Sequence, residues 1–150
     1  MVAKEVIHEF IWGRILPRES LYGFEGVGVL VENLNPVIEK NGLLTSRLQT
    51  DVEEELSKAG IRVLPGSEIG PADPLLYINV NAHKLDELFF YSISVELHQL
   101  VILVRDPSME TLATTRNVGS IGSVNLYEIR GAVKEHIKEF IGDYKATSVN

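Results

Sequence analysis

The stretch 89–105, FFYSISVELHQLVILVR, constrains the fold of this chain more than any other. Its odd-numbered positions are apolar, with Gln99 as the exception among the residues up to 103. Its even-numbered positions are polar over Ser92–His98 and apolar again over Leu100–Val104. Period-two alternation of β-branched and aromatic residues predicts one long strand with a continuous apolar face. The opposite face changes from polar to apolar at Leu100, so we expect another segment or a partner to cover that end.

Length and composition indicate a single globular domain with a net charge of −7. The 14 Lys and Arg residues are scattered along the chain, which argues against a nucleic-acid surface. The chain has no cysteine, so disulfides, thiolate nucleophiles and cysteine-based metal sites are excluded. Its longest apolar run is far shorter than the roughly 20 residues of a membrane-spanning helix.

The N-terminal sequence MVAKEVIHEFIWGR does not have the pattern of a signal peptide, because His8 and Glu9 interrupt its apolar part. A cytoplasmic location is therefore the default expectation. A periplasmic or secreted protein from which an export signal has been removed would show the same sequence.

Residues 1–20 are apolar enough to form a short helix or arm that ends at Pro17. Phe10 and Trp12 are its aromatic residues, and we expect them to dock on the body of the protein or on a neighbouring subunit. Docking within the same chain is the hypothesis that we favour. The expected organisation is an arm over residues 1–20, one domain over residues 21–146 and a tail over residues 147–150.

The other elements follow from their hydrophobic periodicity. Apolar residues at every third or fourth position predict two helices, the first capped by Thr45 or Ser46 and the second by Ser123 or Asn125. Gly60 is expected to end the first helix. Period-two patterns predict strands over residues 25–34, 61–64, 75–84, 89–105 and 111–118, with a turn at 106–108 and a break at 119–122.

Without the short strand at 61–64, the order is β-α-β-β-β-α after an N-terminal arm, which predicts an α+β fold. Two helices should cover one face of a mostly antiparallel sheet and form a two-layer sandwich with it.

Four strings carry a resemblance to known proteins: LLTSRLQTDVEEELSKAGIRVL, PLLYINVNAHK, YSISVELHQLVILVRDP and IKEFIGDYKA. They resemble a group of uncharacterised bacterial proteins that usually carry export signals, over about residues 25–146. The element order is also remotely similar to the N-terminal domain of TolB and to CsgG- and LpoB-type envelope domains. This resemblance implies a binding or assembly role in the envelope, and it implies no catalytic residue.

The polar side of the predicted sheet is the candidate binding surface. Residues on two neighbouring strands should lie side by side there: Tyr77, Asn79, Asn81, His83, Ser92, Ser94, Glu96 and His98. Either Thr114 and Arg116 or Thr115 and Asn117 would add a third row. Such a face could bind a polar ligand or peptide. The alternative is that it is the solvated side of an antiparallel sheet, and this is what such alternation usually indicates.

Glu96 and His98 form the one acid–base or metal-like grouping in the sequence, and we expect His83 near them. We favour an exposed Glu/His pair over a metal site, and we expect no metal or other cofactor. The acidic run Asp51–Glu55 is interpreted as the solvated face of the first helix.

Leu100, Ile102 and Val104 should form an apolar patch on the sheet face turned away from the helices. We favour a homodimer in which sheets or arms meet at this patch, with the intramolecular arm as the alternative.

The sequence contains no G-x-S-x-G, H-E-x-x-H or P-loop motif. We therefore favour a non-enzymatic binding or assembly module that acts as a homo-oligomer, with another protein as a further partner. The alternative is a metal-dependent or acid/base enzyme that uses the Glu96/His98 face of the sheet.

Overall fold

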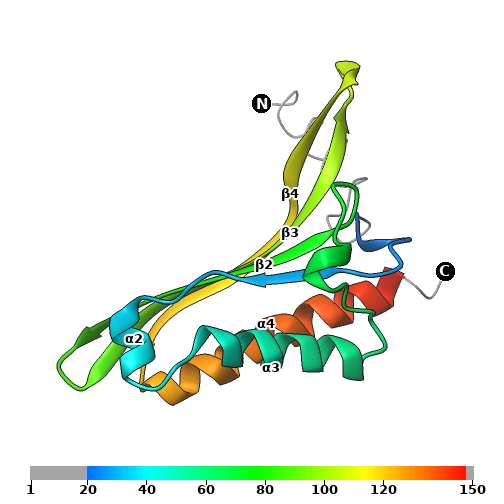
Figure 1. Cartoon of the computed structure of the whole chain (residues 1–150). Helices are drawn as coiled ribbons and strands as arrows, with labels where there is room; N and C mark the ends of the chain where they lie inside the picture. The colour runs from blue at the N-terminus through cyan, green and yellow to red at the C-terminus, as the bar shows by residue number, and fades with distance from the viewer. Residues whose placement is uncertain (1–19, 148–150) are drawn as a thin grey trace, which may run out of the picture.

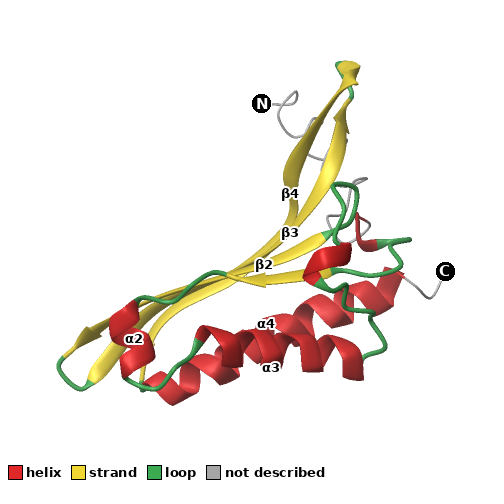
Figure 2. Cartoon of the chain, viewed as in Figure 1, coloured by secondary structure: helices red, strands yellow, loops and turns green. Residues whose placement is uncertain are grey.

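The computed structural model describes residues 20–147. Four strands form one sheet in the order β1-β2-β3-β4, in which β1 and β2 are parallel and the other pairs are antiparallel. The strands are β1 (Gly28–Val31), β2 (Leu75–Leu85), β3 (Leu88–Leu103) and β4 (Asp106–Val124). The helices are α2 (Pro36–Lys40), α3 (Thr45–Lys58) and α4 (Leu126–Thr147), with a 3-10 turn η2 (Gly66–Glu68). Both long helices lie on the same side of the sheet, which confirms the predicted α+β class (Figures 1 and 2).

The core lies between the sheet and the two long helices. The odd-numbered residues of β3 from Phe89 to Leu97 face the helices and are buried, apart from the partly buried Tyr91. The helices meet this face with apolar stripes at helical spacing, formed by Leu48, Val52, Leu56, Ile129, Val133, Ile137 and Phe140. The alternation in the sequence therefore identifies the correct core face of the long strand.

Two of the helix-end predictions are confirmed and one is wrong. The side chain of Asn125 accepts a hydrogen bond from the backbone N–H of Glu128 at 3.2 Å, as expected at the start of α4. Gly60 has a φ of +81° beyond the end of α3, a conformation that favours glycine. The N-cap of α3 is Leu44, which supplies no side-chain hydrogen bond. The hydroxyl of Thr45 instead donates to Glu39 at 2.7 Å and so connects α3 to α2, a helix that the sequence patterns did not predict.

The strand predictions need three corrections. The expected strand over residues 61–64 is reduced to a single bridge between Val27 and Val63. The chain reverses at Val104 and Arg105, ahead of the turn predicted at 106–108. The glycines predicted to break the last strand lie inside β4. A Cβ atom at Gly119 would lie 2.3 Å from the carbonyl oxygen of Ile93 on the neighbouring strand. Glycine at this position permits close approach of the neighbouring strand.

The outer end of the β3–β4 pair leaves the body of the protein and rises away from the helices (Figure 1). The bend coincides with a β-bulge, since Leu97 pairs with Arg116 while His98 pairs with Thr114. Thr115 is the extra residue between them. A bulge of this kind increases local twist and redirects the strand. We call the segment from Leu100 to Leu112 the hairpin.

Candidate functional site

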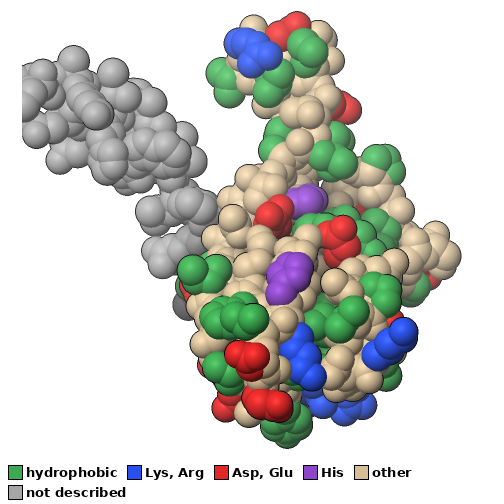
Figure 3. All heavy atoms as spheres, turned by 90° about the vertical axis from the view of Figure 1, so that its left-hand side faces the viewer, with side chains coloured by type: hydrophobic (Ala, Val, Ile, Leu, Met, Phe, Trp, Pro, Cys, Tyr) green, Lys and Arg blue, Asp and Glu red, His purple; other side chains and the backbone are tan. Residues whose placement is uncertain are grey.

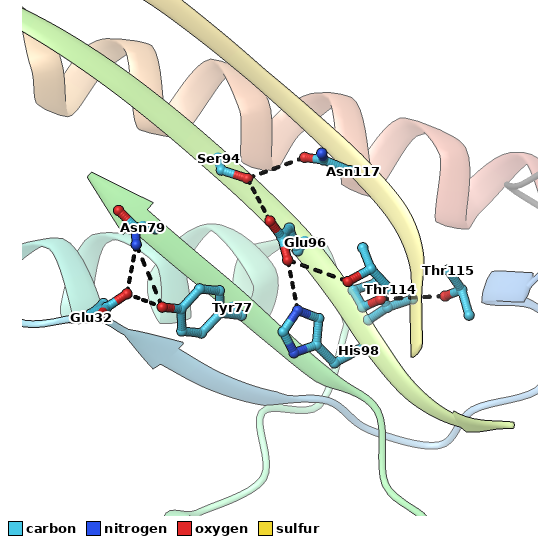
Figure 4. A network of polar contacts seen from close by, with 10 residues as sticks. Glu32, Tyr77, Asn79, Ser94, Glu96, His98, Thr114, Thr115 and Asn117 are labelled. Atoms are coloured by element: carbon cyan, nitrogen blue, oxygen red, sulfur yellow. Dashed lines mark hydrogen bonds and ion pairs between the residues drawn. The ribbon is translucent and has the colours of Figure 1, made fainter. Parts of the chain in front are cut away.

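Polar side chains form a connected network on the sheet face opposite the helices (Figure 4). We call this surface the polar face. Its members come from the end of β1 and from β2, β3 and β4: Glu32, Tyr77, Asn79, Asn81, Ser94, Glu96, His98, Thr114 and Asn117.

Glu96 is the centre of one half of the network. His98 Nε2 lies 2.8 Å from one carboxylate oxygen of Glu96, and Thr114 donates to the same oxygen at 3.3 Å. Ser94 donates to the other oxygen at 2.9 Å. The hydrogen bond with His98, followed by that with Ser94, lowers the pKa of the Glu96 carboxyl below its ordinary value. The carboxylate is therefore held in its charged form with both oxygens engaged by the protein.

Glu32 is the centre of the other half. Its carboxylate accepts hydrogen bonds from the hydroxyl of Tyr77 and, at 2.6 Å, from the side-chain amide of Asn79. The ring of Tyr77 stacks on that of His98, with 5.3 Å between centroids and 19° between planes. Through this stack the two carboxylates belong to one surface. The sequence patterns did not identify Glu32 as a site residue, although the alternation of the first strand places it on this side.

His83 is not brought near the Glu96/His98 pair. It lies opposite Phe90 in the β2–β3 register, whereas Leu75 lies opposite His98. At roughly 3.3 Å per residue, the distance from His83 to His98 along the sheet is on the order of 26 Å. Within residues 20–147 no group of three or more His, Cys, Asp or Glu side chains is arranged to hold a metal ion. Ser92 lies opposite Asn81 on the same face.

The third row of the polar face differs from both predicted alternatives. Thr114 and Asn117 supply it, because the bulge at Thr115 changes the alternation between them. Arg116 is turned to the other side, where it is buried and bonds Asp143 at 2.5 and 2.9 Å.

The prediction that the acidic run of α3 faces solvent is wrong for Asp51. Asp51 is 2% exposed and receives two hydrogen bonds from Arg130 of α4, at 2.8 and 2.9 Å. Arg47 and Lys134 lie 3.5 and 3.9 Å from the same carboxylate. The bond with Arg130 lowers the pKa of the Asp51 carboxyl, against the opposing effect of burial. This cluster joins the two long helices and is a structural feature of the body.

The hairpin exposes large apolar side chains in the described part of the chain. The exposed fractions are 58% for Ile102, 98% for Val104 and 65% for Leu112. In Figure 3 the hairpin stands clear of the body, with hydrophobic side chains along it. The predicted contact residues Phe10 and Trp12 lie outside the described residues, so their docking stays a prediction.

Comparison with protein-family models finds no match for this chain, and comparison with curated proteins finds none either. Among solved structures, a minor lipoprotein from Acinetobacter baumannii aligns over 84% of this chain and 94% of its own length, with 10% identity and a TM-score of 0.45. A protein proposed to be a lipoprotein, from Caulobacter crescentus CB15, aligns over 87% and 94%, with 14% identity and a TM-score of 0.41.

An uncharacterised protein aligns over 84% of this chain and 92% of its own, with 10% identity and a TM-score of 0.33. None of these three is described as a TolB-, CsgG- or LpoB-type protein, so that likeness is not confirmed. With TM-scores below 0.5, the three alignments support no conclusion about function.

None of the helices within residues 20–147 is long and apolar enough to cross a membrane.

Proposed function

We propose that the protein is a non-enzymatic binding or assembly module that acts as a homo-oligomer and uses the hairpin as a contact element. The observation that carries this proposal is the exposure of Ile102, Val104 and Leu112 on a projecting pair of strands. Exposed apolar surface of this kind typically marks an interaction site. Removing each such side chain from water contributes about 1.5–3 kcal/mol.

The location that we propose is the bacterial envelope. This part rests on the resemblance of four sequence strings to proteins that usually carry export signals. The cytoplasmic location expected by default has no support from the structural comparisons.

The alternative is a metal-dependent or acid/base enzyme on the Glu96/His98 face. The 2.8 Å approach of His98 to Glu96 favours it, because a carboxylate beside an imidazole is a common arrangement in general base catalysis. Both oxygens of Glu96 are already hydrogen-bonded to Ser94, His98 and Thr114. A solvated, internally satisfied polar surface explains this arrangement with fewer assumptions.

The contact role of the hairpin is tested by sedimentation of the intact protein and of an I102K/L112K variant at micromolar concentration. We expect the intact protein to self-associate and the variant to sediment with a lower average mass, because two buried lysines without partners oppose association. A matched control, L44K/Y127K, places two lysines on exposed apolar positions of the helical side and should leave the mass unchanged. An intact protein that is monomeric, or a variant with unchanged mass, would contradict the proposal.

A further inference from the structure

β4 forms one edge of the sheet, since β3 pairs with it on one side and no described strand pairs on the other. After the bulge at Thr115 it continues as a regular strand to Val124. Within the described chain, the backbone of Arg116–Val124 makes no backbone hydrogen bond outside the β3 ladder. Its outward N–H and C=O groups are therefore able to pair with a further strand.

This edge lacks the features that usually prevent sheets from pairing. Between Thr111 and Val124 the one charged residue is Arg116, and its guanidinium bonds Asp143 and lies over the ring of Phe140. The proline of β4 is at position 107, at the far end of the strand. Natural proteins protect long edge strands with charges, prolines, bulges or short length, and from Asn117 to Val124 this edge has none of them.

The opposite edge of the same sheet is protected. β1 covers only Gly28–Val31 and is followed by Glu32. Beyond it, the uncovered end of β2 carries Lys84, and the adjoining turn carries Asp86 and Glu87. The contrast between the two edges indicates that the β4 edge has a partner.

We propose that Arg116–Gly122 of β4 pairs antiparallel with the same segment of a second copy of the chain, in a register centred on Gly119. The two sheets then form one continuous sheet across a two-fold axis. A two-fold contact requires a surface that complements itself, and this segment does so.

The self-complementarity comes from a projecting side chain and a hollow on the same strand. Ile121 is 84% exposed on the outer side of β4. It forms one side of a shallow open hollow of about 440 Å³, whose lining also includes Ser94, Asn117 and Gly119. In the proposed register Ile121 of each copy lies opposite Asn117 of the other, so each isoleucine enters the hollow beside the other copy's Gly119.

The register also agrees with the position of the bulge. Pairing outward from Gly119 brings Arg116 opposite Gly122, and the next residue is the bulged Thr115. The paired segment therefore ends where the regular strand ends. The hairpin lies beyond this point and is left out of the contact, so the inference adds a surface that is tested separately from the hairpin.

Disulfide cross-linking tests the register directly, because the chain contains no cysteine. The N117C/I121C variant is prepared on the I102K/L112K background, which removes association through the hairpin. Directly opposed residues have Cβ atoms about 4.5–5.5 Å apart, close to the range that a disulfide bridges. We expect about tenfold more disulfide-linked dimer than with N117C or I121C alone, whose equivalent residues are offset by about 13 Å across the two-fold axis. Equal yields from the double and single variants would overturn the proposal.

A second variant covers the case in which the cysteines disturb folding. I121K, on the same background, changes a side chain that is almost fully exposed and should leave the monomer folded by circular dichroism. We expect it to be monomeric in sedimentation, whereas Y127K on α4 leaves the dimer intact. A dimer that persists in I121K would overturn the edge contact, and dissociation by Y127K would do the same.

Discussion

Asp51 lies between the two long helices with 2% of its surface exposed and Arg130, Arg47 and Lys134 around its carboxylate. Replacing it with asparagine (D51N) leaves these cations without their counter-charge. We expect a loss of about 2 kcal/mol in the free energy of unfolding, the range found for hydrogen bonds to charged groups. Urea unfolding at neutral pH measures it. The control E135Q removes a carboxylate that bonds Lys138 at the surface, where the change should be within about 0.5 kcal/mol.

The ionisation of Asp51 should also make the stability of the protein depend on pH. Arg130 lowers the pKa of the Asp51 carboxyl in the folded state. The stability that the ionised Asp51 contributes is therefore fully present above the unfolded pKa, about 3.9, and is lost as the pH falls through the folded pKa. Between neutral and acid pH the intact protein should therefore lose more stability than D51N does. Parallel losses in the two proteins would contradict this.

The contact with Arg130 also explains why the prediction of a solvated Asp51 was wrong. The two residues are 79 positions apart, and their contact depends on how α3 packs beside α4. The helical periodicity of α3 places Asp51 in an acidic run but carries no information about a cation on another helix. Local patterns predicted the apolar stripes correctly, because those follow from one helix at a time.

At the scale of elements, two glycines inside regular secondary structure differ in whether the structure has room for a side chain. Gly131 is inside α4, where an added Cβ meets nothing within 4 Å, whereas one at Gly119 would meet the carbonyl of Ile93 at 2.3 Å. We expect G131A to stabilise the protein by about 0.5–1 kcal/mol, as alanine does in a helix interior. G119A should destabilise it by about 1–3 kcal/mol through overpacking. Thermal unfolding of the two variants compares them, and a shift of the same sign in both would count against these packing roles.

The strand that contains Gly119 shows the limit of pattern reading for a sheet. Period-two alternation predicts both faces of β3 correctly, since no bulge falls within its own chain. In β4 one additional residue, Thr115, changes the side to which its neighbours point. Both predicted versions of the third row assumed uninterrupted alternation, so each placed one residue correctly and one wrongly. The polar face itself was predicted, but its outermost row required the three-dimensional register.

At the scale of the whole molecule, we expect the body to fold without the hairpin. Within the described residues 20–147, every buried residue of the hydrophobic core lies outside residues 98–125, so the hairpin contributes none of them. Leu100 lies opposite Leu112 in the β3–β4 ladder, which allows residues 101–111 to be replaced by Asn-Gly, a sequence that favours a tight hairpin turn. We expect the shortened chain to unfold cooperatively, with a free energy of unfolding within about 1 kcal/mol of the intact protein, because its core is unchanged.

The same shortened chain distinguishes a contact element from a structural one. If the hairpin serves assembly, its removal lowers the average mass in sedimentation while the circular dichroism spectrum of the body is retained. The proposed pairing through Arg116–Gly122 would remain, because that segment lies on the body side of the bulge. A shortened chain that fails to fold would show instead that the hairpin stabilises the body, and the exposure of Ile102 and Leu112 would then need a different explanation.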